Sequence, residues 1–210
     1  MEKLEMTVDG IEKTFAVNYL GHYVLTQLLM EPVLHKNGPS RIINVASIAH
    51  SWMDNYYTGL KSNQCRVNWK EVSKGTYNGN PWDPFGADGH SKAAMILHAK
   101  FLNADIIENN WNVTINSCHP GCIFDTNLHA NVQLQKTIFY RIFRLLTPLL
   151  FKKVGQGAST QVMLACHPQL NGVTGKYFQD CGQTIPSPLA TSSVIAQELK
   201  QFSQQFIQES

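Results

Sequence analysis

The chain has 210 residues, of which 43% are hydrophobic and 15% are charged, and its formal net charge is +2. This length can bury a substantial core, and this composition excludes an intrinsically disordered chain. The charge is too small and too scattered to favour a nucleic-acid partner. We therefore expect a globular protein with one domain over residues 1–210.

The cysteines and histidines give no sign of a metal site or of an oxidising compartment. Five cysteines without a paired motif are typical of reduced thiols, and Cys118 and Cys122 are expected to be small buried residues. His22, His50 and His119 lack metal-ligand spacing, so we expect packing or capping roles and no bound metal. With no secretory signal and no apolar run of about 18 residues, the sequence predicts a cytoplasmic protein. Attachment to the surface of an intracellular membrane is the alternative.

The first quarter of the chain predicts a helix followed by a strand. Apolar residues at helical spacing predict a helix that is capped at Thr7 or Asp9 and runs to about His35. A Gly-Pro pair follows and ends this helix. The apolar run of residues 41–47 predicts a buried strand that carries a hydroxyl group, that of Ser47, at its carboxyl end.

The middle of the chain predicts a loop, a long helix and a second strand. Residues 50–84 are rich in Gly, Asn, Pro and aromatic residues and show no clear periodicity, which predicts a long loop. An apolar face at helical spacing predicts a helix over residues 86–109. Residues 112–118 predict a strand, and the His-Pro-Gly sequence that follows ends it.

The last third of the chain predicts two further helices and a short strand. Residues 122–135 are expected to be irregular, residues 156–166 helical and residues 175–178 a strand. An amphipathic pattern predicts a C-terminal helix over residues 191–207. The alternation of helices and strands predicts an α/β fold whose parallel strands are joined by right-handed helical crossovers.

The strongly apolar run of residues 137–151 has two interpretations. It can be a helical lid over an apolar ligand, or a segment that lies in a membrane interface with nearby cations at the headgroups. Those cations are Arg141, Arg144, Lys152 and Lys153. We favour the lid because the run is short and carries few charges.

Several motifs occur in a fixed order along the chain. They are Asp9-Gly-Ile-Glu-Lys-Thr-Phe-Ala-Val-Asn-Tyr-Leu-Gly-His22, Arg41-Ile-Ile-Asn-Val-Ala-Ser47, Ser91-Lys92, His119-Pro-Gly121, Gly155-Gln-Gly-Ala-Ser-Thr160, Gly172-Val-Thr-Gly-Lys-Tyr-Phe178 and Ile185-Pro-Ser-Pro188. This set resembles the short-chain dehydrogenase/reductase family, in the subgroup that contains the retinol dehydrogenases and the WW domain-containing oxidoreductases. The resemblance spans nearly the whole chain and implies the C-terminal part of a Rossmann-type, doubly wound parallel sheet.

The resemblance also implies an activity, which is hydride transfer between NAD or NADP and a hydrophobic alcohol or carbonyl compound (retinoid, steroid or lipid-like). Asn18 matches the family's catalytic asparagine, which helps to hold the lysine through water. Ser47 matches the serine that polarises the substrate oxygen. Lys92 matches the lysine that binds the nicotinamide ribose and lowers the pKa of the catalytic tyrosine.

Further cofactor contacts and partners follow from the same resemblance. Pro120 and Gly121 match the backbone that positions the nicotinamide, and Thr126 lies near the position of a contact to the cofactor amide. The spacing from Gly121 to Thr126 is one residue longer than is usual in the family. The implied partners are a small hydrophobic substrate and a second copy of the chain, paired through the helices at residues 86–109 and 155–167.

One departure from the family affects the proton-transfer group. Counting back four residues from Lys92 gives Asp88, where the family has its catalytic tyrosine. A tyrosine with a pKa of about 10 can be lowered by a lysine and still donate a proton, whereas an exposed aspartate, with a pKa of about 3.9, is already ionised at neutral pH. The four-residue spacing also favours a charged Asp88–Lys92 pair on one helix face. We therefore predict that Asp88 leaves the site inactive or severely impaired.

A second departure lies at the beginning of the sequence. The family's Gly-rich turn, which binds the pyrophosphate, and its Asn-Asn-Ala-Gly element do not precede the first helix. The resemblance therefore implies an N-terminally truncated, partial domain, in which the strand of residues 41–47 lacks one neighbour and presents an unpaired edge. Three functions fit: an impaired oxidoreductase, a non-catalytic scaffold that pairs through this edge, or a shortened product of a longer oxidoreductase gene.

Overall fold

The computed structural model describes residues 3–35, 38–59, 65–121, 123 and 152–208. At its centre lies a four-stranded sheet in the order β1 (Ser40–Val45), β2 (Val113–His119), β3 (Tyr177–Gln179) and β4 (Gly182–Thr184). The first three strands run parallel, and β4 runs antiparallel to β3. The α/β class and the parallel strands are confirmed. The sequence did not predict β4, because its three residues are exposed and have no apolar side chains that could form an alternating pattern.

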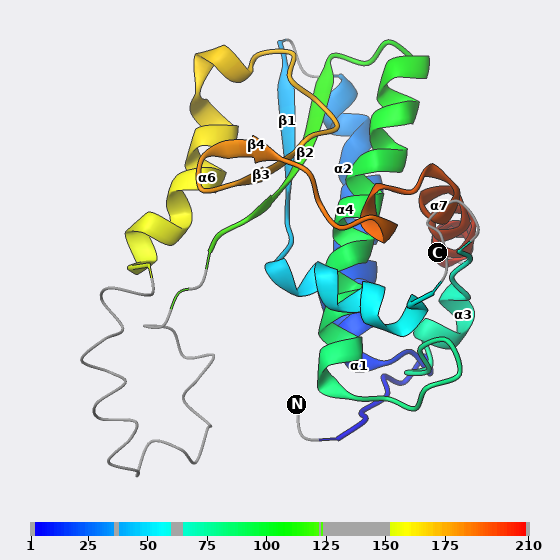
Figure 1. Cartoon of the computed structure of the whole chain (residues 1–210). Helices are drawn as coiled ribbons and strands as arrows, with labels where there is room; N and C mark the ends of the chain where they lie inside the picture. Colours follow the sequence, from blue (N-terminus) through cyan, green and yellow to red (C-terminus); the bar gives the residue numbers. More distant parts are fainter. Residues whose placement is uncertain (1–2, 36–37, 60–64, 122, 124–151, 209–210) are drawn as a thin grey trace, which may run out of the picture.

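Helices precede, connect and follow the strands (Figure 1). They are α1 (Lys13–Phe15), η1 (Ala16–Leu20), α2 (Gly21–Leu34), η2 (Ile48–Tyr57), α3 (Trp69–Val72), α4 (Pro84–Glu108), α6 (Val154–Cys166), η5 (Pro168–Leu170), η6 (Leu189–Thr191) and α7 (Ser193–Gln208). The predicted helices at residues 86–109, 156–166 and 191–207 correspond to α4, α6 and α7. η1 is a turn of π-helix between α1 and α2.

The first helix begins later than predicted. Neither Thr7 nor Asp9 caps it, because Thr7 lies in a separate turn that comes before it. The cap is Glu12, whose carboxylate accepts the backbone N–H groups of Thr14 and Phe15 at 3.0 and 2.8 Å. A fully buried glutamate is stable in this position because its charge meets two otherwise unpaired backbone donors at the positive end of the helix.

The long helix α4 supplies much of the core. The carboxylate of Asp83 caps it by accepting two N–H groups of the first turn, and Pro84 occupies the first helical position, where its missing N–H costs nothing. At Gly89, an added Cβ would lie 3.1 Å from the carbonyl oxygen of Ala49. The glycine therefore allows η2 to pack closely against α4.

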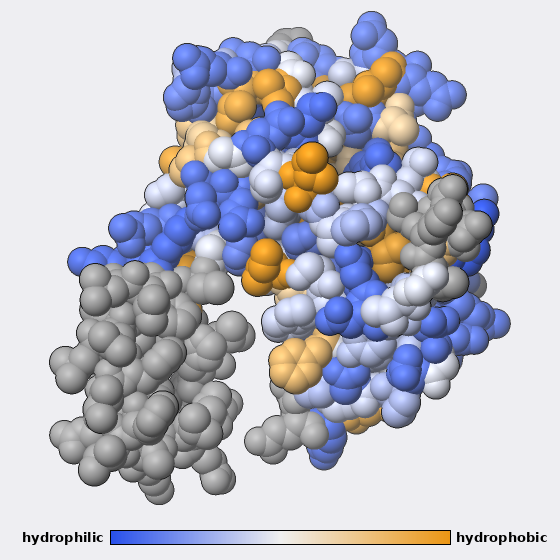
Figure 2. Space-filling model, viewed as in Figure 1, coloured by the Kyte–Doolittle hydropathy of each residue, from blue (hydrophilic) through white to orange (hydrophobic). Residues whose placement is uncertain are grey.

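The sheet lies between two helical layers. Figure 1 shows α2 and α4 on one face, with α7 beyond α4, and α6 on the other face. The main hydrophobic core fills the space between the sheet and the first of these layers, and includes the fully buried Ile115 of β2. A smaller cluster of Cys118, Leu164 and Phe178 lies under α6. On the face shown in Figure 2, the coloured apolar residues form separate spots rather than one broad patch.

Two predictions about local structure are wrong. The segment of residues 50–84 is not one long loop, since η2, α3 and a bridge between Tyr77 and Asn80 lie within it and Trp69 is buried. The aromatic residues of this segment lack helical spacing, so the sequence did not predict these elements. Packing against the rest of the fold stabilises them. The strand predicted to be buried is instead half-exposed along most of its length, because β1 lies at the edge of the described sheet.

Some predictions concern residues outside the described part of the chain. These are Thr126, Cys122, most of the irregular stretch 122–135 and the apolar run 137–151, with both its interpretations. No helix of the described residues combines the length and the apolar character needed to cross a membrane.

Candidate active site

Asn18 extends from the π-helical turn η1 to the first half of α4. Its Nδ2 donates a hydrogen bond to Ser91 Oγ at 3.0 Å and lies 3.5 Å from Asp88 Oδ1, at the outer limit for a hydrogen bond. Ser91 Oγ donates in turn to the carbonyl oxygen of Asp88 at 2.9 Å. Single π-helical turns are frequent at functional sites. The structure therefore brings together two of the predicted site residues, Asn18 and Asp88.

Ser47 lies just beyond the end of β1 and begins η2. Its Oγ accepts the backbone N–H of Ala49 at 3.2 Å, so the side chain acts as a helix cap and keeps its own proton for another acceptor. η2 packs on α4 at Gly89, the residue after Asp88. Ser47 is thus held near the part of α4 that carries the other predicted residues.

His50 fixes the backbone that carries Ser47. Its Nε2 accepts the N–H of Ser187 at 3.0 Å, so Nδ1 carries the proton and donates to the carbonyl oxygen of Ser47 at 2.6 Å. Burial lowers the pKa of this imidazole, which favours the neutral ring that the two contacts require. The predicted packing role of His50 is confirmed.

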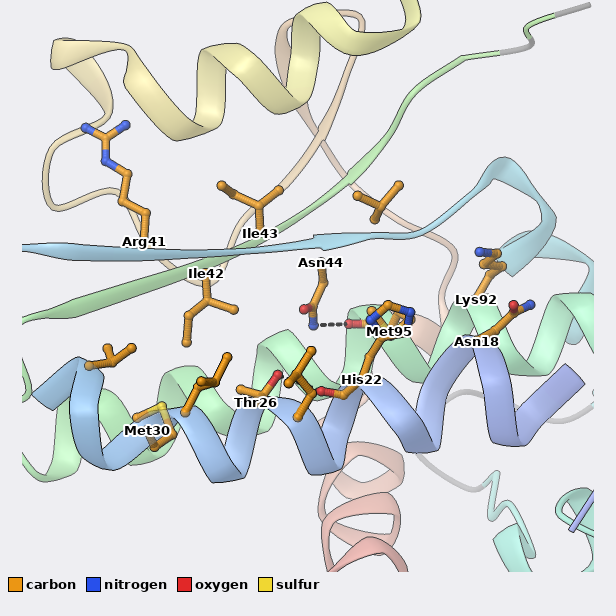
Figure 3. Close-up of a pocket in the computed structure, with 14 residues that line it drawn as sticks. Asn18, His22, Thr26, Met30, Arg41, Ile42, Ile43, Asn44, Lys92 and Met95 are labelled. Atoms are coloured by element: carbon orange, nitrogen blue, oxygen red, sulfur yellow. Dashed lines mark hydrogen bonds between the residues drawn. The ribbon is translucent and has the colours of Figure 1, made fainter. Parts of the chain in front are cut away.

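Lys92 lines a cavity of about 470 Å³ between α2, β1 and α4. Figure 3 shows Lys92 and Asn18 near each other at the end of the cavity that lies toward the carboxyl end of β1. Most of the remaining lining is apolar and comes from α2 and β1. The predicted asparagine and lysine therefore share one end of an otherwise mainly apolar cavity.

Asp88 is half-buried, and its surroundings differ from those of an exposed aspartate. Burial raises the pKa of its carboxyl group above the usual value, and the charge of Lys92 only partly offsets this effect. Among the described residues, no ion pair within 4.0 Å joins Asp88 to Lys92. Desolvation therefore outweighs the lysine in setting the direction of the pKa shift, in contrast to the charged pair predicted on the helix face.

Pro120 and Gly121 follow β2 at the carboxyl edge of the sheet. Gly121 has a φ of +90°, and a Cβ at this position would lie 2.7 Å from Cδ of Lys152. The side chain of Lys152 therefore lies directly against this backbone, and its ammonium group forms an ion pair with Asp180. The left-handed backbone favours glycine here, whereas the end of the lysine side chain can move aside for a Cβ.

Ser91 and Lys152 are two residues near the site that were not predicted. Ser91 links Asn18 to the backbone of α4, but its place beside Lys92 in the sequence does not show which way it points. Lys152 reaches Gly121 from 31 residues farther along the chain. Only the folded chain reveals these contacts.

Sequence comparisons identify related proteins. The chain is 36% identical over 203 residues to the short-chain dehydrogenase TIC 32 B, chloroplastic, of Brassica napus, covering 95% of this chain and 58% of that protein. It is 33% identical over 204 residues to the human WW domain-containing oxidoreductase, covering 97% and 45%. Human retinol dehydrogenase 14 is 35% identical over 193 residues, covering 92% and 51%. The chain thus spans about half the length of these relatives.

Structural comparisons agree on the fold. A putative uncharacterised protein from Mycobacterium paratuberculosis matches with a TM-score of 0.64 and 20% identity, over 98% of this chain and 62% of that one. The NADPH-bound carbonyl reductase from chicken fatty liver matches with a TM-score of 0.50 and 15% identity, over 89% and 62%. No family model matches the sequence.

Proposed function

The chain belongs to the short-chain dehydrogenase/reductase family, and from this premise we propose that it carries the substrate-side half of an NAD(P)-dependent oxidoreductase centre. The substrate class is a hydrophobic alcohol or carbonyl compound, which the similarity to retinol dehydrogenase 14 supports. We propose further that Asp88, at the position of the family's catalytic tyrosine, severely impairs this chain as a catalyst.

The observation that carries the proposal is the convergence of separate elements on the first half of α4. Asn18 arrives from η1, Ser47 from the loop after β1, and Lys92 belongs to α4 itself. These positions are 29 and 45 residues apart along the sequence; Asn18 and Lys92 line one cavity, and η2, which Ser47 begins, packs on α4 at Gly89. A lysine, a hydroxyl donor and an amide around one helix face suit a reaction in which charge develops on a substrate oxygen.

The reaction oxidises an alcohol to a carbonyl compound, or runs in reverse. A bound nicotinamide supplies the hydride acceptor. Ser47 Oγ has a proton free to donate to the substrate oxygen, because its cap contact uses only a lone pair. The hydroxyl proton of the alcohol needs a base, and the carboxylate of Asp88 is a far weaker base than a tyrosinate.

The described residues fit only one end of a dinucleotide. Lys92 offers an ammonium group for a ribose, while the backbone at Gly121 is covered by Lys152. A Gly-rich turn between a strand and a helix binds pyrophosphate in dinucleotide-binding folds. Residues 3–35 instead hold the turn at Thr7 and the helix capped by Glu12. Cofactor binding by this chain is therefore the first quantity to measure.

A non-catalytic scaffold is the alternative function. The replacement of the tyrosine by Asp88 favours it. A scaffold keeps the fold but has no need of cofactor binding, so the same experiment separates the two functions.

The test begins with isothermal titration calorimetry of NADH and of NADPH against the 210-residue chain, with circular dichroism as the check of folding. The oxidoreductase proposal expects saturable binding of one of them. Retinal reduction is then assayed for Asp88→Tyr and for Asp88→Phe, which fills the same space without a hydroxyl. Asp88→Tyr should exceed Asp88→Phe by about 100-fold or more. A folded chain that binds neither nucleotide, or equal rates for the two variants, contradicts the proposal.

A further inference from the structure

A chain of hydrogen bonds links the Ser47 backbone to a distant part of the sequence. His50 donates from Nδ1 to the carbonyl oxygen of Ser47 at 2.6 Å, and its Nε2 accepts the backbone N–H of Ser187 at 3.0 Å. Ser187 Oγ donates in turn to Asp54 Oδ1 at 3.2 Å, and Asp54 belongs to η2, as His50 does. His50 and Ser187 are 137 positions apart along the chain. One imidazole ring therefore joins the segment around Ser187 to the residue at the position of the family's catalytic serine.

The segment of residues 185–188 connects β4, which is exposed, to η6, whose Leu189 is buried. Ser187 lies between Pro186 and Pro188, which have no backbone N–H, so its own N–H is the only backbone donor in this run of three. Ile185, just before the run, is 84% exposed. His50 thus accepts from the one backbone donor at the place where the chain returns from the surface to the core.

The surroundings of His50 favour its neutral form. The residue is 3% exposed, and its ring packs edge-on against that of Tyr177 in β3, with the ring centroids 5.2 Å apart. Among the described residues, the titratable groups that face this ring are Asp54 of η2, His119 of β2 and the phenol of Tyr177. Burial lowers the pKa of His50, and the bond to Ser47 and the charge of Asp54 offset this only in part. The ring is therefore neutral at pH 7.

Protonation of His50 breaks this link on one side only. A charged imidazole donates from both nitrogens and has no lone pair left at Nε2, so it cannot accept the N–H of Ser187. Its Nδ1 can still donate to the carbonyl oxygen of Ser47. This oxygen and Ser47 Oγ also accept the backbone N–H groups of His50 and Ala49, at 3.1 and 3.2 Å, and so form the first turn of η2. The charged ring therefore keeps its bond to that turn but loses the support on its other side.

We propose that His50 is a positioning residue for Ser47 and that residues 185–188 are the support against which it holds this serine. Only the neutral ring, with its proton at Nδ1, contacts both partners at once. Acidification therefore disconnects Ser47 from the segment. The inference rests on the role that we propose for Ser47 in catalysis. The contact itself is a property of the folded chain, so it can be measured without cofactor or substrate.

The first measurement is an NMR titration of the unchanged chain from pH 8 to pH 5, with nitrogen-15 in the histidine rings and in the backbone. At pH 8 the ring nitrogens of His50 should show a neutral imidazole with its proton at Nδ1. Because the pKa of His50 is lowered, its ring should titrate with a midpoint below pH 6.5. The amide signals of Ser187 and Ala49 should move with the same midpoint.

Three variants assign the effect to the imidazole. His50→Gln keeps a donor and an acceptor but has no titratable group, so the shared pH dependence of Ser187 and Ala49 should disappear. His50→Phe keeps a flat ring without either contact, and hydrogen exchange at Ser187 and Ala49 should be at least about tenfold faster than in the unchanged chain at pH 8. Ser187→Ala is the matched control, because it keeps the N–H and loses only the contact with Asp54. It should leave exchange at Ala49 unchanged.

A catalytic measurement separates this inference from the proposed function. In the Asp88→Tyr background, His50→Phe should lower kcat for retinal reduction about tenfold and change KM by less than about twofold, because Ser47 acts on the reacting oxygen. An unchanged kcat in an active background contradicts the inference. An inactive Asp88→Tyr variant counts against the proposed function instead, and the titration then decides the positioning role.

Three results of the NMR measurements overturn the inference. The first is a midpoint at Ala49 that differs from that of the His50 ring. The second is a pH dependence that persists in His50→Gln and therefore belongs to Asp54 or His119. The third is exchange in Ser187→Ala that is as fast as in His50→Phe, which makes the serine hydroxyl the support. The titration uses the unchanged chain, so it decides even if His50→Phe does not fold.

Discussion

β1 and β2 are paired strands of similar composition in very different surroundings. They run parallel over six residue pairs, from Ser40 with Val113 to Val45 with Cys118. β2 has a neighbour on each side and is buried along nearly its whole length, whereas β1 has a neighbour on one side and is half-exposed. The two strands therefore contribute different amounts to the free energy of folding, because burial of their side chains depends on the neighbouring strands and helices.

The largest expected effect compares two isoleucines that face each other in the register. Ile115 of β2 is fully buried, and its partner Ile42 of β1 lines the open cavity. Ile115→Ala should lower the free energy of unfolding by about 2–5 kcal/mol, because it leaves a closed cavity. Ile42→Ala should lower it by roughly 1–2 kcal/mol, because one side of the Ile42 side chain faces the open cavity and makes fewer contacts. Urea unfolding measures both, and equal losses contradict the comparison.

A second prediction concerns acid sensitivity beneath β1. His98 is fully buried next to Asn44, and burial lowers its pKa from 6.5 to about 3; that of His90 falls to about 4. Both imidazoles therefore bind a proton near pH 6.5 in the unfolded chain but stay neutral in the folded chain. The free energy of unfolding falls as the pH drops below 6.5. At pH 5 each histidine should cost about 2 kcal/mol relative to pH 8.

The variant His98→Phe tests the assignment of this effect. It keeps an aromatic ring among Tyr19, Tyr23 and Phe101 but cannot bind a proton. The loss of stability between pH 8 and pH 5, measured by urea unfolding, should shrink by about 2 kcal/mol compared with the unchanged chain. An unchanged pH profile shows that His98 is not responsible.

The smallest expected effect comes from introducing a hydroxyl group at Val45 or at Cys118, which form the last residue pair between β1 and β2. Cys118 is fully buried in the cluster under α6, and burial raises the pKa of its thiol to about 12, so it stays protonated and inert. Cys118→Ser should cost about 1–3 kcal/mol, because the hydroxyl lies in an apolar cluster. Val45→Thr, at the partly exposed partner position, should change stability by less than about 0.5 kcal/mol. Thermal unfolding of both variants measures the two losses of stability. A larger loss for Val45→Thr than for Cys118→Ser contradicts the comparison.

The sequence predicted the elements that are encoded by the residues within them. The apolar face of α4 and the strand β2 are encoded by neighbouring residues, and both elements lie within two residues of their predicted bounds. The start of the first helix was misplaced because a buried glutamate caps it, and this choice depends on packing around Glu12 rather than on usual capping preferences. The contacts of Ser91 and Lys152 were missed for the same reason.

The sequence by itself determined the family resemblance, the α/β order and the identity of the residue four positions before Lys92. These are properties of residue types and spacings. The tertiary structure alone decided that an apolar cavity lies between β1, α2 and α4, and that burial at Asp88 outweighs the charge of Lys92. Burial and solvation depend on residues far apart in the chain, and no local pattern reports which neighbours a strand or a carboxyl group receives.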